Sequence, residues 1–263
     1  MHDRDGRLKN DSLYYRVWDT ASPRAHAFIS HGYAEHGGRY DHVARALNEA
    51  GLTVWAIDHR GHGNSEGERG DIGGWDSAAA DFDLLVDAAV AEAGDLPRFL
   101  IGHSLGGGIA VAYTLAHQDR LSGVSLSGPA IVFPPEVIEL LDQPEPPADF
   151  SLADAISSDP AVVQAYKDDP LVYLGPPPRG MIDAMKSAHT LAERLPEITI
   201  PVQVMHGSTD LLVPVDAFKA VVAGVSSTDV FARLWPGLFH EIFNEATDGK
   251  VVGTLVDWIA ERL

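Results

Sequence analysis

Short hydrophobic runs alternate along the chain with longer segments in which hydrophobic residues recur at helical spacing. Six runs have the length, the β-branched or aromatic content and the closing turn residues of buried strands, and they occupy residues 26–32, 52–58, 98–104, 122–128, 202–207 and 230–237. The helical segments lie near residues 39–50, 76–93, 105–117, 214–224 and 247–262. Strands that alternate with helices predict an α/β fold, with a mostly parallel central sheet covered by helices on both faces.

Two segments depart from this alternation. Residues 8–20 predict an antiparallel hairpin at the edge of the sheet. Residues 130–190 contain two proline-rich stretches, FPPEVIELLDQPEPPADF and LGPPPRGM. Proline at this density argues against a regular helix or a central strand, and a long insertion in a compact domain usually has a function of its own.

Composition narrows the classes of protein. Of the residues, 45% are hydrophobic and 22% are charged, which is ordinary for a globular protein. The chain has no cysteine, which excludes disulfides, thiolate metal sites and a cysteine nucleophile. The polar N-terminal residues lack the apolar core of a secretory signal, and no hydrophobic run approaches the ~18 residues of a membrane span. We therefore expect a soluble, cytoplasmic protein.

The charge balance is strongly acidic. Against 38 acidic residues the chain has 19 basic ones, a formal net charge of −19. Such a surface repels the phosphates of nucleic acids and of anionic lipids, so we expect no nucleic-acid partner.

The sequence GHSLGGG, residues 102–108, lies between a predicted strand and a predicted helix. Glycines at a helix start can bind phosphate, but here no lysine follows them and no acidic residue stands about 20 positions further on. The alternative is a serine presented on a sharp turn as a nucleophile, which requires G-x-S-x-G. Gly102 to Gly106 supply that pattern, so Ser104 is the predicted nucleophile.

A serine hydroxyl needs an imidazole to accept its proton and a carboxylate to orient that imidazole. Asp210 follows the predicted strand 202–207 and His240 follows the strand 230–237, in the order that such a turn requires. For the oxyanion we expect the backbone N–H of Leu105 and, from the loop 30–40, that of Tyr33.

Six motifs extend this pattern over most of the chain: HGYAEHGGRYDHVA, DHRGHGNSEGERG, GHSLGGG, AYKDDPLV, HGSTDLLVP and WPGLFHEIFNE. They resemble, in their order along residues 26–250, the monoacylglycerol lipases of the α/β-hydrolase superfamily, a group also described as lysophospholipase-like or serine aminopeptidase-type hydrolases. The resemblance implies an α/β-hydrolase core of residues 1–129 and 191–263, and a cap of residues 130–190 over an acyl tunnel. It implies cleavage of monoacylglycerols to glycerol and fatty acid through an acyl-enzyme.

The same resemblance implies roles for individual residues. Ser104, Asp210 and His240 form the triad, with Tyr33 and Leu105 as oxyanion donors. Glu35, Arg39 and Tyr166 correspond to the positions that recognise glycerol. Tyr33 stands where the family usually has a small residue, so its side chain must point away from the pocket or narrow it.

Several alternatives stay open. The same triad serves carboxylesterases, lysophospholipases, thioesterases and peptidases, and a non-catalytic receptor keeps only the pocket. The histidines 31, 36, 103 and 206 with Asp58 have no metal-binding spacing, so we expect no metal and no cofactor. Asp58 and Arg60 are expected to order the loop that contains them.

The expected partner is a small lipid ester. The apolar residues Val137, Ile138, Leu140 and Leu141 belong either to the core of the cap or to a face in transient contact with lipid aggregates. The sequence does not indicate an oligomeric state.

Overall fold

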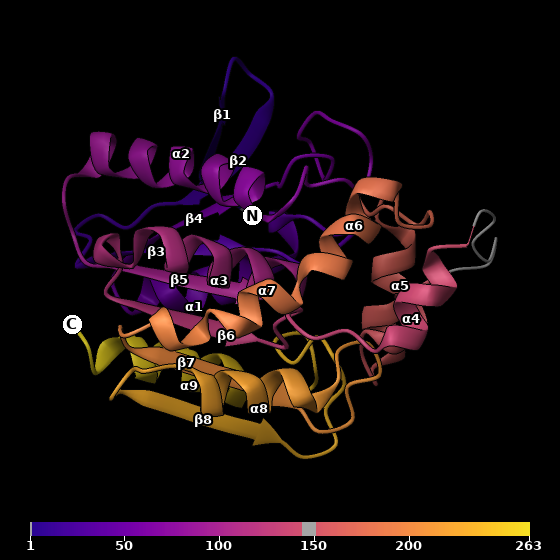
Figure 1. Cartoon of the computed structure of the whole chain (residues 1–263). Coiled ribbons are helices and arrows are strands. Elements are labelled where there is room, and N and C mark those ends of the chain that lie inside the picture. The colour runs from indigo at the N-terminus through magenta and orange to yellow at the C-terminus, as the bar shows by residue number, and fades with distance from the viewer. Residues whose placement is uncertain (1, 144–150) are drawn as a thin grey trace.

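A single eight-stranded sheet forms the centre of the molecule (Figure 1). The computed structural model describes residues 2–143 and 151–263. The strands lie in the order β1-β2-β4-β3-β5-β6-β7-β8. Their bounds are β1 Arg4–Leu8, β2 Leu13–Trp18, β3 Ala25–Ser30, β4 Leu52–Ile57, β5 Arg98–His103, β6 Gly123–Ser127, β7 Val202–Gly207 and β8 Val230–Trp235. From β4 to β8 every neighbouring pair is parallel, which confirms the predicted α/β class.

The N-terminal hairpin is also confirmed, with a different first strand. β1 and β2 pair antiparallel at one edge of the sheet, and β2 pairs antiparallel with β4. The first strand, β1, ends at Leu8, whereas the predicted hairpin began at this residue. Lys9, Asn10 and Asp11 all have positive φ angles, so these residues form the turn of the hairpin.

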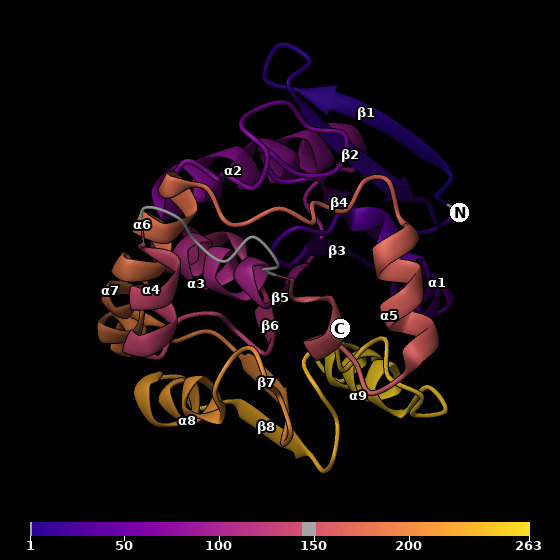
Figure 2. The ribbon, with the colours of Figure 1, turned by 90° about the vertical axis from the view of Figure 1, so that its right-hand side faces the viewer.

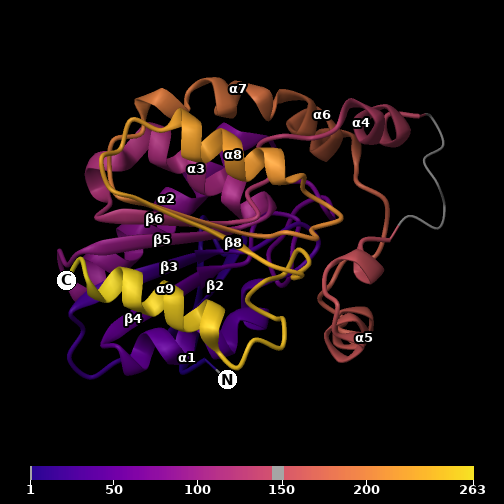
Figure 3. The same ribbon diagram turned by 90° about the horizontal axis from the view of Figure 1, so that it is seen from below.

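Helices cover both faces of the sheet, as the alternating pattern predicts (Figure 3). One face carries α1 and α9, and the other carries α2, α3, α7 and α8. Their bounds are α1 Asp41–Glu49, α2 Trp75–Ala93, α3 Leu105–His117, α7 His189–Glu193, α8 Val215–Gly224 and α9 Lys250–Ala260, with short 3-10 turns at Gly37–Tyr40, Gln118–Arg120, Ala153–Ala155 and Leu195–Glu197. None of the helices within the described residues is long and apolar enough to cross a membrane.

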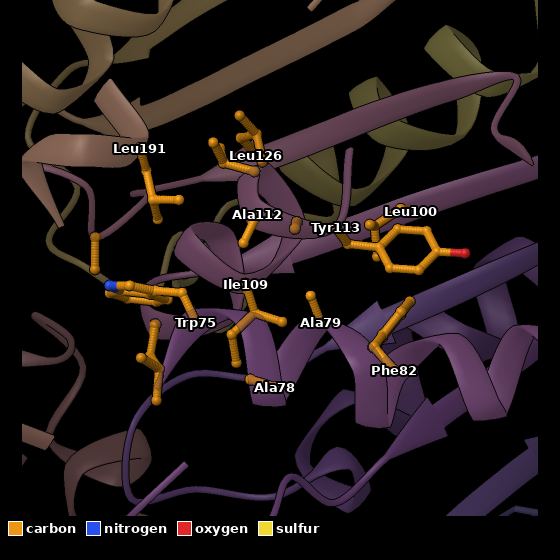
Figure 4. Close-up of a cluster of buried hydrophobic side chains, with 14 of the residues drawn as sticks. Trp75, Ala78, Ala79, Phe82, Leu100, Ile109, Ala112, Tyr113, Leu126 and Leu191 are labelled. Carbon is orange, nitrogen blue, oxygen red and sulfur yellow. The ribbon is translucent and has the colours of Figure 1, made fainter. Parts of the chain in front are cut away.

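The largest hydrophobic cluster of the described residues lies between the sheet and the helices that include α2 and α3 (Figure 4). Phe82 of α2 packs edge-on against Tyr113 of α3, with their ring centroids 5.3 Å apart. Trp75, at the start of α2, donates its indole N–H to the carbonyl of Ala184 at 2.9 Å. This contact joins α2 to the segment that connects β6 with β7.

That connecting segment was predicted to lack regular helices because of its prolines, and this was wrong. It contains α4 Pro135–Leu141, α5 Pro160–Asp168 and α6 Arg179–Ser187. Pro135 and Pro160 occupy the first turn of their helices, where a missing N–H costs no hydrogen bond, and Pro178 directly precedes α6. Part of the first proline-rich stretch, residues 144–150, lies outside the described residues.

Helices α4, α5 and α6 stand at one end of the sheet (Figure 2). The β8 arrow of Figure 1 points toward this end, which is therefore the carboxyl end of the parallel strands. Ligands of open α/β sheets bind at that end. The division into a core and a cap of residues 130–190 stays a prediction, and α7 at the end of this segment already packs against α3 and α8 of the core.

The loop after β4 is ordered by Asp58, as predicted. Its buried carboxylate accepts hydrogen bonds from the backbone N–H groups of Gly37 and Asn64, each at 2.9 Å, and pairs with Arg16 of β2. Arg60 binds Asp81 of α2 through Nη2 at 2.7 Å.

Candidate active site

Ser104 is the single residue between the end of β5 and the start of α3. Its backbone is strained, with φ of 54° and ψ of −121°. Non-glycine residues adopt positive φ at an energetic cost, which is tolerated where the surroundings fix it. Here the carbonyl of Ser104 accepts hydrogen bonds from the N–H groups of Gly107 and Ala130. A Cβ on Gly106 would lie 2.0 Å from the carbonyl oxygen of Ser30, so only glycine lets α3 approach β3 this closely. The G-x-S-x-G pattern therefore builds the predicted sharp turn.

Asp210 and His240 meet although 30 residues separate them. Asp210 follows β7, His240 follows β8, and the two strands are parallel neighbours. The Nδ1 of His240 donates to Oδ2 of Asp210 at 2.7 Å. The other carboxylate oxygen, Oδ1, accepts from the N–H groups of Leu212 at 2.8 Å and Val213 at 2.9 Å.

The electrostatics of this pair suit a general base. Burial opposes ionisation of Asp210, but the charge of His240 and several hydrogen bonds hold the pKa of that carboxyl well below its ordinary value. Burial alone would lower the pKa of His240, but the charge and hydrogen bond of Asp210 outweigh it and raise the pKa above 6.5. With Nδ1 bonded to the carboxylate, Nε2 is the nitrogen left to exchange a proton.

Ser104 and His240 both line a cavity of about 290 Å³ beneath the α4–α6 segment. Most of its wall is apolar and is contributed by Leu105, Phe133, Val137, Leu140, Leu141, Ile156, Met181 and Met185, among others. The polar lining residues include Glu35, His103 and Glu241, whose side-chain N and O atoms cluster within 4.8 Å of one another. The cavity thus has an apolar compartment and a polar compartment, with Ser104 in its wall.

Both predicted oxyanion donors border this cavity. Within the described residues, neither the N–H of Tyr33 nor that of Leu105 donates to another atom of the protein. The loop that carries Tyr33 is fixed from two sides, since Gly32 N–H donates to Glu35 Oε1 at 2.6 Å and Ala34 accepts from Tyr173 N–H at 2.8 Å. The phenol oxygen of Tyr33 lies next to Gly70, where an added Cβ would be 2.9 Å from it, and Tyr33 also lines the cavity.

The predicted head-group residues form one buried cluster. Arg39 donates to Glu35 Oε2 at 2.7 Å and to both oxygens of Glu241 at 2.5 and 2.8 Å. Its guanidinium also lies over the ring of Tyr166, 4.8 Å from the centroid. Glu35, Tyr166 and Glu241 line the 290 Å³ cavity, whereas Arg39 lies behind the two carboxylates and borders a second, more open pocket. Arg39 therefore orients the cluster from behind.

Residues 21–247 match the family described as serine aminopeptidase, S33. The chain belongs to this family. It is 41% identical to the monoacylglycerol lipase of Mycolicibacterium smegmatis, with 95% of this chain and 94% of that one covered. Among solved structures, this chain is similar to a monoacylglycerol lipase from Paleococcus ferrophilus, with a TM-score of 0.79 and 28% identity. The alignment covers 95% of this chain and 99% of the Paleococcus chain. This chain is also similar to a carboxyl esterase from Bacillus coagulans in complex with glycerol, with a TM-score of 0.85, 26% identity and 99% of each chain covered. These matches confirm the α/β-hydrolase fold that the resemblance implied.

Two residues that line the cavity, His103 and Glu241, were not predicted from the sequence to contact substrate. Glu241 directly follows His240 in the chain. His103 directly precedes Ser104, and the centroid of its ring lies 4.7 Å from that of His240. Their positions beside predicted catalytic residues were the available signal. Burial and the charge of His240 lower the pKa of His103 to about 3, so its ring is neutral.

The described residues contain one group whose ligand atoms could converge on a metal ion, and it differs from the histidine set considered above. Glu35, His103 and Glu241 have ligand atoms within 4.8 Å of one another. Both carboxylates already neutralise Arg39, and Glu35 also accepts from Tyr40 at 2.7 Å. The chemistry of this group is therefore that of an ion-pair cluster.

Proposed function

We propose that this protein is a serine hydrolase that cleaves monoacylglycerols to glycerol and a free fatty acid. The observation that carries the proposal is the shared cavity: the strained Ser104 and the Asp210-bound His240 both face a pocket with one apolar and one polar compartment. The monoacylglycerol lipases among the similar proteins support the same substrate class.

In the proposed mechanism, Ser104 Oγ attacks the ester carbonyl while His240 Nε2 takes its proton. The N–H groups of Tyr33 and Leu105 bind the oxyanion of the tetrahedral intermediate. The protonated His240 then gives its proton to the departing glycerol oxygen, and the acyl-enzyme forms. A water molecule, activated by the same histidine, releases the fatty acid and restores Ser104.

The polar compartment favours a neutral head group. Glu35 and Glu241 bring two carboxylates to it, and Arg39 supplies one guanidinium behind them. The cluster keeps a net negative charge in a buried place, where charges interact strongly. Glycerol hydroxyls can donate to these carboxylates, whereas the phosphate of a lysophospholipid would be repelled. Monoacylglycerol is therefore favoured over the lysophospholipid alternative.

Labelling with a fluorophosphonate tests the nucleophile. The wild type should take up one label per chain, and Ser104→Ala should take up none while losing about 10³- to 10⁶-fold in kcat. Equal unfolding midpoints of the two proteins serve as the control for folding. A labelled Ser104→Ala protein would refute the proposal at its first step.

A substrate comparison tests the head group. Monoacylglycerol should have a higher kcat/KM than the glycerophosphate ester of the same fatty acid. Glu241→Gln removes one negative charge with little change in shape, so it should narrow this difference, mainly through KM for the phosphate ester. A p-nitrophenyl ester of the same chain is the control without a head group. If the phosphate ester is the better substrate of the wild type, the head-group assignment is wrong.

We further propose that the mouth of the cavity touches lipid aggregates. Val137, Leu140 and Leu211 line the cavity and are exposed by 37%, 51% and 62%. Leu141 of the same helix is buried, so α4 divides the predicted apolar cluster between interior and surface. The cytoplasmic location expected from the sequence stays a prediction.

A further inference from the structure

A second histidine lies beside the Asp210 carboxylate and the turn that binds it. His206, near the end of β7, is fully buried, and its Nε2 lies 3.1 Å from Asp210 Oδ2 and 3.0 Å from the carbonyl oxygen of Val213. The turn is tight, because the N–H of Asp210 donates to the carbonyl of Gly207 at 3.3 Å. This turn places the carboxylate of Asp210 beside the ring of His206.

Hydrogen bonding assigns the protonation of His206. Its Nε2 faces two acceptor oxygens, so this nitrogen must carry a proton. Its Nδ1 is buried and has no hydrogen-bond partner among the described residues, so a proton placed there would be a buried donor without an acceptor. The Nε2–H tautomer leaves only the Nδ1 lone pair, a weak acceptor, without a partner, and we assign this tautomer to His206.

We infer that His206 is a positioning residue for the proposed catalytic carboxylate, sharing its Nε2–H between Val213 and Asp210 Oδ2. The inference rests on the proposed function, because it matters only if Asp210 orients His240. Oδ1 is held by the two backbone N–H groups, and Oδ2 then lies between two imidazoles. His206 limits rotation of the carboxylate and takes up part of the negative charge of Oδ2.

Among the described residues, those that line the 290 Å³ cavity do not include His206. A change at this position should therefore act on the chemical step and leave substrate binding intact. Besides Asp210, the titratable groups that face His240 are His103, Glu241 and Glu35, and none of them changes in the variants below.

The experiment compares His206→Leu, His206→Gln and His26→Leu, assayed on monoacylglycerol and on a p-nitrophenyl ester. Leucine removes the N–H donor and fills the buried site with an apolar side chain. Glutamine restores an N–H donor near the position of Nε2. His26 is the matched control, since it is a fully buried strand histidine with an unpartnered Nε2, at the opposite end of the sheet.

His206→Leu should lower kcat roughly 10- to 100-fold, the size expected for one hydrogen bond to a charged group, with KM changed less than about twofold. The loss of a donor leaves more charge on Oδ2, which stabilises the His240 imidazolium, so the acid limb of kcat/KM should move to higher pH. His206→Gln should restore most of both effects. His26→Leu should lower the unfolding midpoint and leave kcat and the acid limb unchanged.

Wild-type kcat with an unshifted acid limb in His206→Leu would overturn the inference, and so would an equal loss of kcat in His26→Leu. If His206→Leu does not fold, His206→Asn replaces it, because the shorter amide does not reach Oδ2. Failure of the proposed function is recognised separately: Asp210→Asn would then keep its activity, whatever the His206 variants do.

Discussion

At the residue scale, the proposed chemistry depends on how one imidazole is held. His240 is buried, and the adjacent Asp210 carboxylate is the main group that makes its charged form favourable there. The same carboxylate selects the tautomer whose Nε2 faces the cavity. One hydrogen bond of 2.7 Å thus sets both the basicity and the orientation of the base.

This arrangement predicts a specific pH profile. His240 must be neutral to accept the serine proton, so kcat/KM should fall as the pH drops through its pKa, which lies above 6.5. Asp210→Asn removes the group that raises this pKa and should move the acid limb downward, with a loss of about 10⁴-fold in kcat. Steady-state kinetics from acid to neutral pH measure both effects. An unchanged limb in Asp210→Asn would show that another residue controls the titration.

At the scale of elements, the site depends on how closely α3 packs against the sheet. Gly106 faces the carbonyl of Ser30, and no side chain fits between them. The turn that exposes Ser104 and the loop that carries Tyr33 leave the sheet at adjacent strands, β5 and β3. Close packing of the helix is therefore a condition for the two predicted oxyanion donors to face one cavity.

Gly106→Ala should test this packing. The added methyl group meets rigid backbone, so we expect a destabilisation of about 3 kcal/mol or more and a loss of fluorophosphonate labelling in the fraction that folds. Gly253→Ala is the matched control: it lies inside α9, an added Cβ has no atom within 4 Å, and it should stabilise by about 0.5–1 kcal/mol. Urea unfolding measures both changes. Equal unfolding midpoints of the two variants would contradict the packing argument.

The sequence predicts elements well where a regular period runs over several turns, as in α2 and α3. It fails for α4, α5 and α6, because these helices are short and begin at or directly after prolines, whose effect depends on their position in the first turn. Motif order was enough to predict the pairing of Asp210 with His240 and the presence of Ser104 and His240 at one cavity. The contacts of Glu241 and His206 could not be predicted in the same way, since they depend on loop conformations that bring non-periodic residues together.

At the scale of the whole molecule, buried histidines link stability to pH. The rings of His31, His59 and His62 pack together beneath the loop that carries Tyr33, with centroids 4.4 and 5.5 Å from His31. Burial and the neighbouring rings lower the pKa of His59 to about 3, and burial lowers that of His62 to about 4. In the unfolded chain both regain an ordinary pKa near 6.5.

Below pH 6.5 the unfolded chain therefore binds protons that the folded protein does not, and stability should fall as the pH drops from 6.5 toward 3. The loss should be on the order of 5 kcal/mol over this range. Urea unfolding at several pH values, in high salt to screen the net charge of −19, measures it. His59→Gln should flatten the curve, and a stability independent of pH between 6.5 and 4 would contradict the argument.

The chain leaves β6 to build α4, α5 and α6 and returns to the neighbouring strand β7, in direct register with the one it left. The β6–β7 pairing joins segments on either side of this excursion, and the Asp210–His240 pair is formed entirely by residues after it, so the length of the excursion does not alter their alignment. Evolution can lengthen, shorten or replace the excursion while the reaction centre stays in place. For the protein engineer, exchanging this one connection between relatives is the most direct way to change which acyl chains the enzyme accepts.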